Sequence, residues 1–391
     1  MARPEGMSRQ YPYPIARIGL IGGGQLGRML VRAAKQLGCT TVVLDPVEDS
    51  PAGQIATRQI VGGYHDADKI RELAEDCDVL TFELEDIDAD TLAGLEANGQ
   101  AVHPSSRILK TIQDKLTQKE CLKNHGIPTS RFEAVAQPSE DQFGKFGYPL
   151  VQKARRGGYD GRGVSVMKTA ADFDQHLPVP SLIEDFVDAE KEIAVLVARS
   201  ARGEVVTYPP VEMCFRSGEN VLDLLLAPAS IDDAVRTRAE QIAIKTVEAL
   251  EGVGIFGVEM FVQRDGGVLV NEIAPRTHNS GHHTIEANVT DQFEQHLRAI
   301  LGLPLGSTET LSPAAMVNLL GAPGERGRPV LRGLEETLAI PGVCLHLYGK
   351  AQTSPFRKMG HITILDHDTS AARAKANLVR DTIEIGAEKE E

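Results

Sequence analysis

VEMFVQRDGGVLVNE, residues 258–272, carries the strongest fold signal in the chain, because it predicts two apolar strands joined by a glycine turn. A hairpin of this kind can place Glu259 and Glu272 side by side on one face of a sheet. Such a pair suits Mg²⁺ held between protein and phosphate, because Mg²⁺ prefers hard oxygen ligands and usually takes one or two carboxylates. Taken alone, the stretch is also compatible with two solvated acids beside an ordinary hairpin.

A glycine-rich loop upstream favours a nucleotide as the ligand. Four glycines within residues 157–163 follow Lys153 at the end of one apolar strand and precede a second strand, 164–167. Lysine supplies a compact positive charge, and glycines let backbone N–H groups approach phosphate oxygens. The pattern is typical of a flap over nucleotide phosphates, and the alternative is a flexible hairpin tip with a solvated lysine.

A third glycine pattern lies near the N-terminus. Gly22, Gly24 and Gly27 follow the apolar strand 17–21, and Asp45 ends the next strand. The order strand, glycine turn, helix and strand predicts a βαβ unit with parallel strands. Its spacing matches the dinucleotide-binding fingerprint and by itself indicates NAD, although the same turn serves any phosphorylated ligand or a purely structural purpose.

The order of elements predicts an α/β protein of several domains. We expect the strands 182–187 and 191–197 to pair around a hinge, and a long helix over 232–250 to lead into the hairpin. The regions we expect are a flexible leader over 1–14, a Rossmann-like domain over 15–104, a lobe with a helical linker and the flap over 105–195, a lobe with the paired acids over 196–305, and a β-rich cap over 306–391.

Composition narrows the classes of partner. The 391-residue chain has a formal net charge of -14, which argues against a nucleic-acid backbone or an anionic membrane, because both require clustered Lys and Arg. No run approaches the roughly 18 apolar residues of a membrane span. The five cysteines are far apart and form no CxxC, which favours neither a disulfide framework nor a zinc site. We therefore expect a cytoplasmic protein with reduced cysteines.

Four motifs together resemble the N5-carboxyaminoimidazole ribonucleotide synthetases, which are ATP-grasp ligases of purine biosynthesis. The motifs are GGGQLG (22–27), GYDGRG (158–163), NEIAPRTHNSGH (271–282), and YGK (348–350) followed by RKMGH (357–361). The resemblance covers residues 15–380. It implies an α/β ATP-grasp fold with an N-terminal Rossmann-like, pre-ATP-grasp domain and a small C-terminal β-rich domain.

The resemblance implies ATP- and bicarbonate-dependent carboxylation of 5-aminoimidazole ribonucleotide through carboxyphosphate, with ATP and Mg²⁺ as the required cofactors. It places magnesium on Glu259 and Glu272, the adenine at the hinge 184–187 and the ribose on Glu192. The residues that it implies around ATP are Arg107, Lys153, Gly158, Tyr159, Asp160, Gly161, Arg162, Gly163, Val164, Glu184, Asp185, Phe186, Val187, Glu192, Asn271 and Glu272.

The residues that follow the strand ending at Glu272 are expected to face the reacting carbon. Arg276 is assigned to bicarbonate or its phosphorylated product, with Tyr159 and Arg162 lining the pocket from the flap. For His278, beside Asn279, direct participation and a structural hydrogen bond both stay open. The residues implied for the ribonucleotide are Gly24, Gln25, Leu26, Glu83, Lys350, Arg357 and Lys358.

Two features depart from a simple match. His282 and His283 resemble a metal pair, but with magnesium as the implied ion we do not expect zinc there. Residues 212–215 lack the histidine that family members often carry, so a nucleotide contact in that segment is not expected.

Three alternative functions compete with this interpretation. A formate-using ATP-grasp transformylase would show the same acids and phosphate anchors, although the flap residues Tyr159 and Asp160 favour the carboxylating branch. An NAD-linked oxidoreductase would leave the second glycine loop and the paired carboxylates unexplained. A nucleotide sensor without catalysis would be expected to lose Lys153, Glu259 or Glu272, and all three are present. A homodimer is a family-level expectation.

Overall fold

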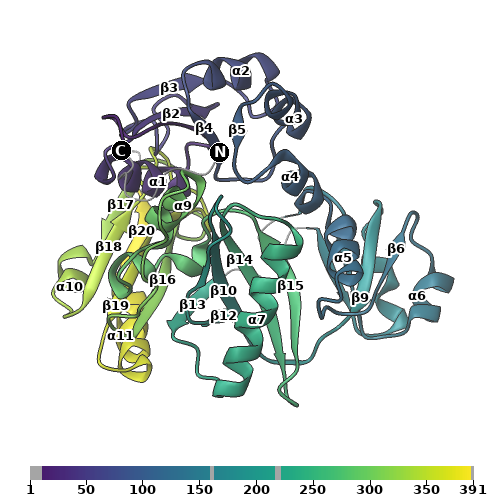
Figure 1. Cartoon of the computed structure of the whole chain (residues 1–391). Helices are drawn as coiled ribbons and strands as arrows, with labels where there is room; N and C mark the ends of the chain where they lie inside the picture. The colour runs from purple at the N-terminus through teal and green to yellow at the C-terminus, as the bar shows by residue number, and fades with distance from the viewer. Residues whose placement is uncertain (1–10, 159–162, 216–221, 389–391) are drawn as a thin grey trace. The chain divides into compact units, whose positions relative to one another are not determined.

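The computed structural model describes residues 11–158, 163–215 and 222–388 of the chain. The chain divides into two compact units, residues 1–103 and 104–391 (Figure 1). Each unit has its own sheets and core, and each is described by itself.

The first unit is a five-stranded parallel sheet with the strand order β3-β2-β1-β4-β5. The predicted βαβ unit is confirmed, since β1 pairs in parallel with β2 across the intervening helix α1. The strands β1, β2 and β4 are mostly apolar and buried, as is usual when helices cover a parallel sheet. The elements are β1 Arg17–Ile21, α1 Gln25–Gln36, β2 Thr40–Asp45, β3 Arg58–Val61, α2 Ala67–Glu75, β4 Val79–Phe82, α3 Ala89–Ala97 and β5 Ala101–Val102.

The second unit begins with two helices and a four-stranded antiparallel sheet in the order β6-β9-β7-β8. In this sheet Lys153 lies opposite Val164, so the glycine-rich loop connects β7 to β8 as the sequence predicts. The elements are α4 Ser106–Ile112, α5 Lys115–Asn124, β6 Phe132–Val135, α6 Glu140–Phe146, β7 Leu150–Ala154, β8 Val164–Met167, the 3-10 helix η1 Ala170–Gln175 and β9 Ser181–Asp185.

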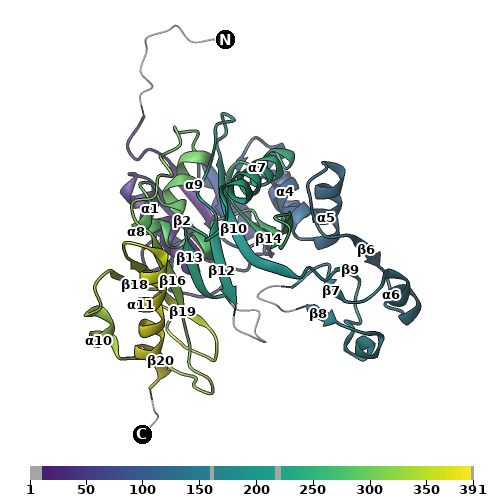
Figure 2. The same cartoon turned by 90° about the horizontal axis from the view of Figure 1, so that it is seen from below.

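A larger antiparallel sheet follows, with the order β15-β14-β10-β12-β13-β16-β19-β18 and β11 paired to β10. The helix α7 packs on β10, β14 and β15 around a core that includes Val195, Val247 and Phe256 (Figure 2). The elements are β10 Ala189–Arg199, β11 Val205–Thr207, β12 Val211–Phe215, β13 Leu222–Ala227, α7 Asp233–Ala249, β14 Gly254–Gln263, β15 Val268–Ala274, the 3-10 helix η2 Asn279–Gly281, α8 Thr284–Ala287 and α9 Gln292–Ile300.

The C-terminal β-rich region continues this sheet, because β16 pairs with β13 and β19 pairs with β16. The helix α11 covers these strands, and β17 pairs with β20 in a separate two-stranded sheet (Figures 1 and 2). The elements are β16 Ala314–Leu320, β17 Pro329–Arg332, α10 Leu334–Leu338, β18 Val343–Leu347, β19 Lys358–Leu365, α11 Thr369–Thr382 and β20 Glu384–Ala387.

One predicted strand pairing is wrong. The segments 182–187 and 191–197 do not pair with each other: β9 lies between β6 and β7, whereas β10 lies between β12 and β14. Both strands are apolar, and each finds its partners in a different sheet. Residues 186–188 therefore connect two sheets, so the hinge joins two lobes of the unit rather than turning a hairpin.

Candidate active site

The paired acids form the centre of the candidate site. Glu259 on β14 lies directly opposite Glu272 on β15, so the prediction that they share one face of the sheet is confirmed. Met260 lies opposite Val270, which leaves Asn271 as the extra residue of a β-bulge. The Oδ1 atom of Asn271 accepts a hydrogen bond of 2.8 Å from the Lys153 ammonium. The bulge thus adds an amide oxygen to the two carboxylates.

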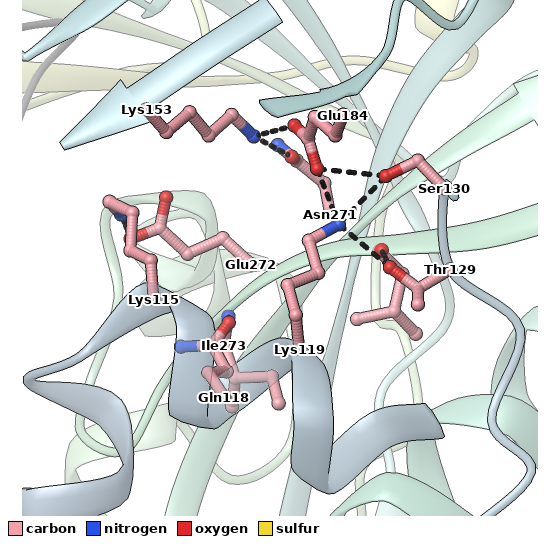
Figure 3. A network of polar contacts seen from close by, with 11 residues as sticks. Lys115, Gln118, Lys119, Thr129, Ser130, Lys153, Glu184, Asn271, Glu272 and Ile273 are labelled. Atoms are coloured by element: carbon pink, nitrogen blue, oxygen red, sulfur yellow. Dashed lines mark hydrogen bonds and ion pairs between the residues drawn. The ribbon is translucent and has the colours of Figure 1, made fainter. Parts of the chain in front are cut away.

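A buried ion network lies beside Glu272 (Figure 3). The Lys119 ammonium lies 2.8 Å from Glu184 and donates to Thr129 at 2.7 Å and Ser130 at 2.9 Å. The Ser130 hydroxyl donates to the same Glu184 oxygen at 2.8 Å, and Lys153 pairs with the other oxygen. Lys153 therefore links the hinge carboxylate of Glu184 to the Asn271 amide.

The network holds Glu184 ionised and Lys153 charged. Burial alone would raise the pKa of Glu184, but the ammonium groups of Lys153 and Lys119 outweigh it and lower the pKa to about 2. Burial would likewise lower the pKa of Lys153, yet the pKa is raised because the attraction of Glu184 prevails. The pKa of Lys119 is lowered, because burial outweighs its pairing with Glu184. A phosphate that reaches Lys153 would therefore meet a full positive charge.

The helix α5 also reaches β15 directly. The Lys115 ammonium lies 2.6 Å from Oε1 of Glu272, and the Gln118 side-chain oxygen accepts a hydrogen bond of 3.2 Å from the Ile273 backbone (Figure 3). Desolvation raises the pKa of Glu272, but Lys115 reverses this effect and the pKa is lowered. Glu272 is therefore ionised and already paired with a cation of the protein.

Glu192 shares the sheet face of the paired acids. It lies opposite Phe261, two residues from Glu259 along β14, and alternate residues of a strand face the same side. Burial and the nearby Glu259 carboxylate raise the pKa of Glu192 to about 7, although Lys153 opposes them. Of the four carboxylates gathered here, this one is set to gain a proton near neutral pH.

His278 is fixed against Glu259 by its surroundings. Its Nδ1 atom accepts a hydrogen bond of 3.3 Å from the Ser280 backbone, so a neutral ring carries its proton on Nε2. Nε2 lies 3.3 Å from Oε1 of Glu259. A Cβ atom on Gly257 would lie 2.8 Å from Cβ of His278, so glycine is required where the ring approaches β14. The fully buried Gln292 accepts from the His278 N–H and donates to its carbonyl, both at 2.8 Å.

Arg276, Asn279 and the two histidines that follow lie near His278 in the sequence, and their contacts differ from those of His278. Arg276 donates through Nη1 to the Thr277 carbonyl at 3.0 Å, and Asn279 begins η2. His282 and His283 are buried, and burial lowers the pKa of His283 to about 4. Within the described ranges, the structure holds no group of three His, Cys, Asp or Glu side chains arranged to bind a metal. Magnesium does not require such a group, since one or two carboxylates suffice beside phosphate and water.

Arg107 and the hinge each have polar partners within the protein. Arg107 donates to the Leu250 carbonyl at 2.9 Å and pairs with Glu251 at 2.7 Å, which places it at the C-terminal end of α7. Asp185 pairs with Arg131 at 2.7 Å, and Phe186 is 42% exposed. A cavity of about 760 Å³ adjoins the hinge, and its lining includes Asp185, Phe186, Val187, Arg131, Tyr148 and Leu269.

The flap is described at its two ends. Gly158 and Gly163 belong to the described chain, and Val164 begins β8. The Gly163 carbonyl accepts a hydrogen bond of 2.8 Å from Ala154, which closes the base of the loop. The predicted site residues Tyr159, Asp160, Gly161 and Arg162 lie outside the described residues.

In the N-terminal glycine turn, backbone amides donate to carboxylates of the same unit. Glu83 accepts from the Gly24 amide and, at 2.5 Å, from the Gly27 amide at the start of α1. Asp45 accepts from the Gly23 amide at 2.8 Å. A phosphate at the Gly24 amide would have to displace Glu83, since an anion already satisfies this helix end. Gln25 and Leu26, also expected at the ribonucleotide, are the first residues of α1. These contacts disfavour NAD as the ligand.

The basic residues near the C-terminus gather in one loop and the strand that follows it. The Lys350 ammonium donates to the Lys358 carbonyl at 2.7 Å, and Arg357 donates to the Gln352 carbonyl at 2.8 Å. Lys358 begins β19. The Lys350 ammonium therefore lies beside the start of β19, and the Arg357 guanidinium is held within the loop that precedes this strand.

The sequence interpretation missed Lys115, Gln118, Lys119 and Gln292. A signal for two of them is present, because Asp114 is a typical N-cap residue and Lys115 and Lys119 follow it at i, i+4 spacing on one helix face. Gln292 carries no comparable signal, since its role depends on a contact between distant segments.

Comparison with known proteins defines the class first. Three family models match in order along the chain: a ribonucleotide synthetase preATP-grasp domain over residues 15–113, an ATP-grasp domain over 120–293, and a phosphoribosylaminoimidazole carboxylase C-terminal domain over 314–375. The fold and the site thus define an ATP-grasp enzyme with three consecutive family regions.

Similarity to whole proteins is more specific. The N5-carboxyaminoimidazole ribonucleotide synthase of Synechococcus elongatus is 43% identical over 371 residues, which is 93% of each chain. The crystal structure of the corresponding synthetase from Thermotoga maritima has a TM-score of 0.90 and 50% identity, and covers 95% of this chain and 100% of that one. An Aspergillus clavatus synthase, solved in complex with ADP and 5-aminoimidazole ribonucleotide, has a TM-score of 0.86 and 35% identity over 94% of this chain and 98% of that one. The chain belongs to the N5-carboxyaminoimidazole ribonucleotide synthase family.

Proposed function

We propose that this protein carboxylates 5-aminoimidazole ribonucleotide to N5-carboxyaminoimidazole ribonucleotide, using ATP and bicarbonate and releasing ADP and phosphate. The observation that carries the proposal is the direct opposition of Glu259 and Glu272 beside the charged Lys153. Family membership supports the same reaction, since relatives of similar length carry this activity in their names.

The oxygen donors of the site fit Mg²⁺. Glu259 and Glu272 supply two carboxylates, and the bulged Asn271 adds an amide oxygen, which are the hard ligands that this ion prefers. These residues would hold magnesium together with ATP, and the ion would supply positive charge against the negative charge that develops as the γ-phosphoryl group moves. His278 orients Glu259 through its Nε2 proton, which favours a structural hydrogen bond over direct participation.

ATP lies between the two lobes in this proposal. Lys153 binds phosphate oxygens, and the hinge from Glu184 to Val187 faces the adenine. Glu192 accepts hydrogen bonds from the ribose hydroxyls. Because the Glu184 carboxylate is already satisfied by Lys119 and Lys153, the hinge contributes its backbone rather than this side chain. Arg107, which is held by Glu251, must change partner to reach a phosphate.

Bicarbonate is a poor electrophile, so an oxygen of bicarbonate first attacks the γ-phosphorus and ADP leaves. The ribonucleotide amine then attacks the carboxyl carbon of carboxyphosphate, and phosphate leaves. Arg276 is assigned to the anionic intermediate, and Lys350, Arg357 and Lys358 to the ribonucleotide phosphate. The flap, residues 157–163, excludes water that would destroy the intermediate.

A homodimer and a cytoplasmic location complete the proposal. None of the helices in the described part of the chain is long and apolar enough to cross a bilayer. Light scattering on the purified chain tests the dimer, since a mass of one chain would contradict it.

ADP release tests the proposed reaction most simply. We expect release that requires both 5-aminoimidazole ribonucleotide and bicarbonate, with the label of ¹³C-bicarbonate entering the product. Formate in place of bicarbonate serves as the control substrate. Release driven by formate but not by bicarbonate would contradict the proposal.

A further inference from the structure

Lys115 is placed to interact with the proposed metal site rather than to stabilise its own helix. It is the first residue of α5, where a positive charge opposes the helix dipole, and the first turn contains no acidic residue. Its side chain is only 15% exposed and crosses to β15, where Nζ meets Glu272. Its position is therefore explained by Glu272, not by helix stability.

The backbone beneath Lys115 is fixed. Asp114 caps α5 by accepting from the Leu116 and Thr117 amides, and it also binds Arg155. The Lys115 N–H donates to the Arg155 carbonyl at 2.9 Å. Because the backbone is fixed, the Lys115 ammonium can move away from Glu272 only by rotation about its side-chain bonds.

We propose that Lys115 is a displaceable counter-cation of Glu272, which competes with a divalent metal for this carboxylate. The inference rests on the proposed function, in which Glu272 is a metal ligand. An ammonium 2.6 Å from Oε1 neutralises the charge that attracts the metal. A divalent ion also repels that ammonium twice as strongly as a monovalent ion at the same distance.

The second proposed ligand has a comparable arrangement. Oε1 of Glu259 lies 3.3 Å from Nε2 of His278. Both carboxylates thus have a proton donor of the protein beside them, and the metal alone meets a site of reduced negative charge. The triphosphate brings the missing negative charge, so metal and nucleotide bind together more tightly than either binds alone.

Binding of Mn²⁺ without nucleotide tests this inference on the full chain. Free Mn²⁺ is followed by electron paramagnetic resonance in wild type, Lys115→Met and the control Lys123→Met. Lys123 is an exposed lysine on the same helix, so its removal changes the net charge equally. We expect Lys115→Met to bind Mn²⁺ about tenfold more tightly, equivalent to about 1.4 kcal/mol, and Lys123→Met to match wild type.

Unchanged or weaker Mn²⁺ binding in Lys115→Met overturns the inference. Circular dichroism checks the fold, and Lys115→Gln replaces the methionine variant if that variant does not fold. Glu272→Gln separates the two proposals. This variant must bind Mn²⁺ more weakly than wild type, and adding Lys115→Met to it must not tighten Mn²⁺ binding. If Glu272→Gln binds Mn²⁺ as tightly as wild type does, the metal assignment itself fails. If Glu272→Gln binds Mn²⁺ more weakly but Lys115→Met does not bind it more tightly, only the counter-cation role of Lys115 is rejected.

Discussion

Lys119 and Glu184 form an ion pair of 2.8 Å in which only 4% of each side chain is exposed. Lys119 comes from α5 and Glu184 from β9, at the start of the hinge. Because Glu184 also holds Lys153, the pair fixes the lysine proposed for the ATP phosphates. Packing of α5 thereby sets the position of Lys153 in the proposed nucleotide site.

Removal of the Lys119 charge is expected to damage both stability and ATP binding. Lys119→Met should lower the free energy of unfolding by about 3 kcal/mol, because it breaks a buried ion pair. It should also raise the ATP dissociation constant measured by calorimetry, since Glu184 then draws Lys153 more strongly. Lys145→Met is the control, because its pair with Asp141 is 75% and 76% exposed and should contribute no more than about 0.5 kcal/mol. Equal effects of the two variants would contradict the prediction.

Glu192 predicts a pH dependence with a definite sign. Its pKa rises from an ordinary value of 4.5 to about 7 on folding, so its contribution to stability is full below pH 4.5 and is lost as the pH rises through 7. The free energy of unfolding of Glu192→Gln, relative to that of wild type, should therefore increase by about 2 kcal/mol when the pH is raised from about 5.5 to about 8. Urea unfolding at the two pH values measures this difference. Glu190→Gln, at an exposed position of the same strand, is the control, and a pH-independent difference for Glu192→Gln would refute the assignment.

Substitution of Gln292 is expected to lower the turnover number, whereas the same substitution of Gln295 on the same helix is not. Gln292→Leu removes both hydrogen bonds to the His278 backbone, so the turnover number should fall at least about tenfold with little change in the KM for ATP. Gln295 makes an equivalent pair of bonds of 2.7 and 2.8 Å to Gly306. Gln295→Leu should cost similar stability but retain turnover. Equal loss of turnover in both variants would mean that general destabilisation, not the position of His278, explains the effect.

The sequence predicted the local elements well and their long-range partners less well. The hairpin and the opposition of Glu259 and Glu272 follow from strand period and turn chemistry, which are local properties. The βαβ unit around Gly22 to Gly27 follows for the same reason. The partners of β9 and β10 were wrong, because two apolar strands near a turn carry no mark of the sheet that each joins.

The interior of the site shows the same limit. Lys153 is recognisable beside its glycine loop, whereas Lys119 is an ordinary helical lysine until β9 brings Glu184 against it. Glu83 is visible as an acid at a strand end, but its bonds to the Gly24 and Gly27 amides depend on tertiary packing. Ion pairs between distant segments thus determine which residues remain available to a ligand.

Turnover of the variant Glu272→Ala, measured as ADP released with 5-aminoimidazole ribonucleotide, bicarbonate, ATP and Mg²⁺, tests the central assignment most directly. The proposed site requires a loss of roughly a thousandfold, because a bound metal contributes several kcal/mol to transition-state stabilisation, with the far-ultraviolet circular dichroism of wild type retained. A folded Glu272→Ala enzyme with wild-type turnover would show that this acid holds no essential metal.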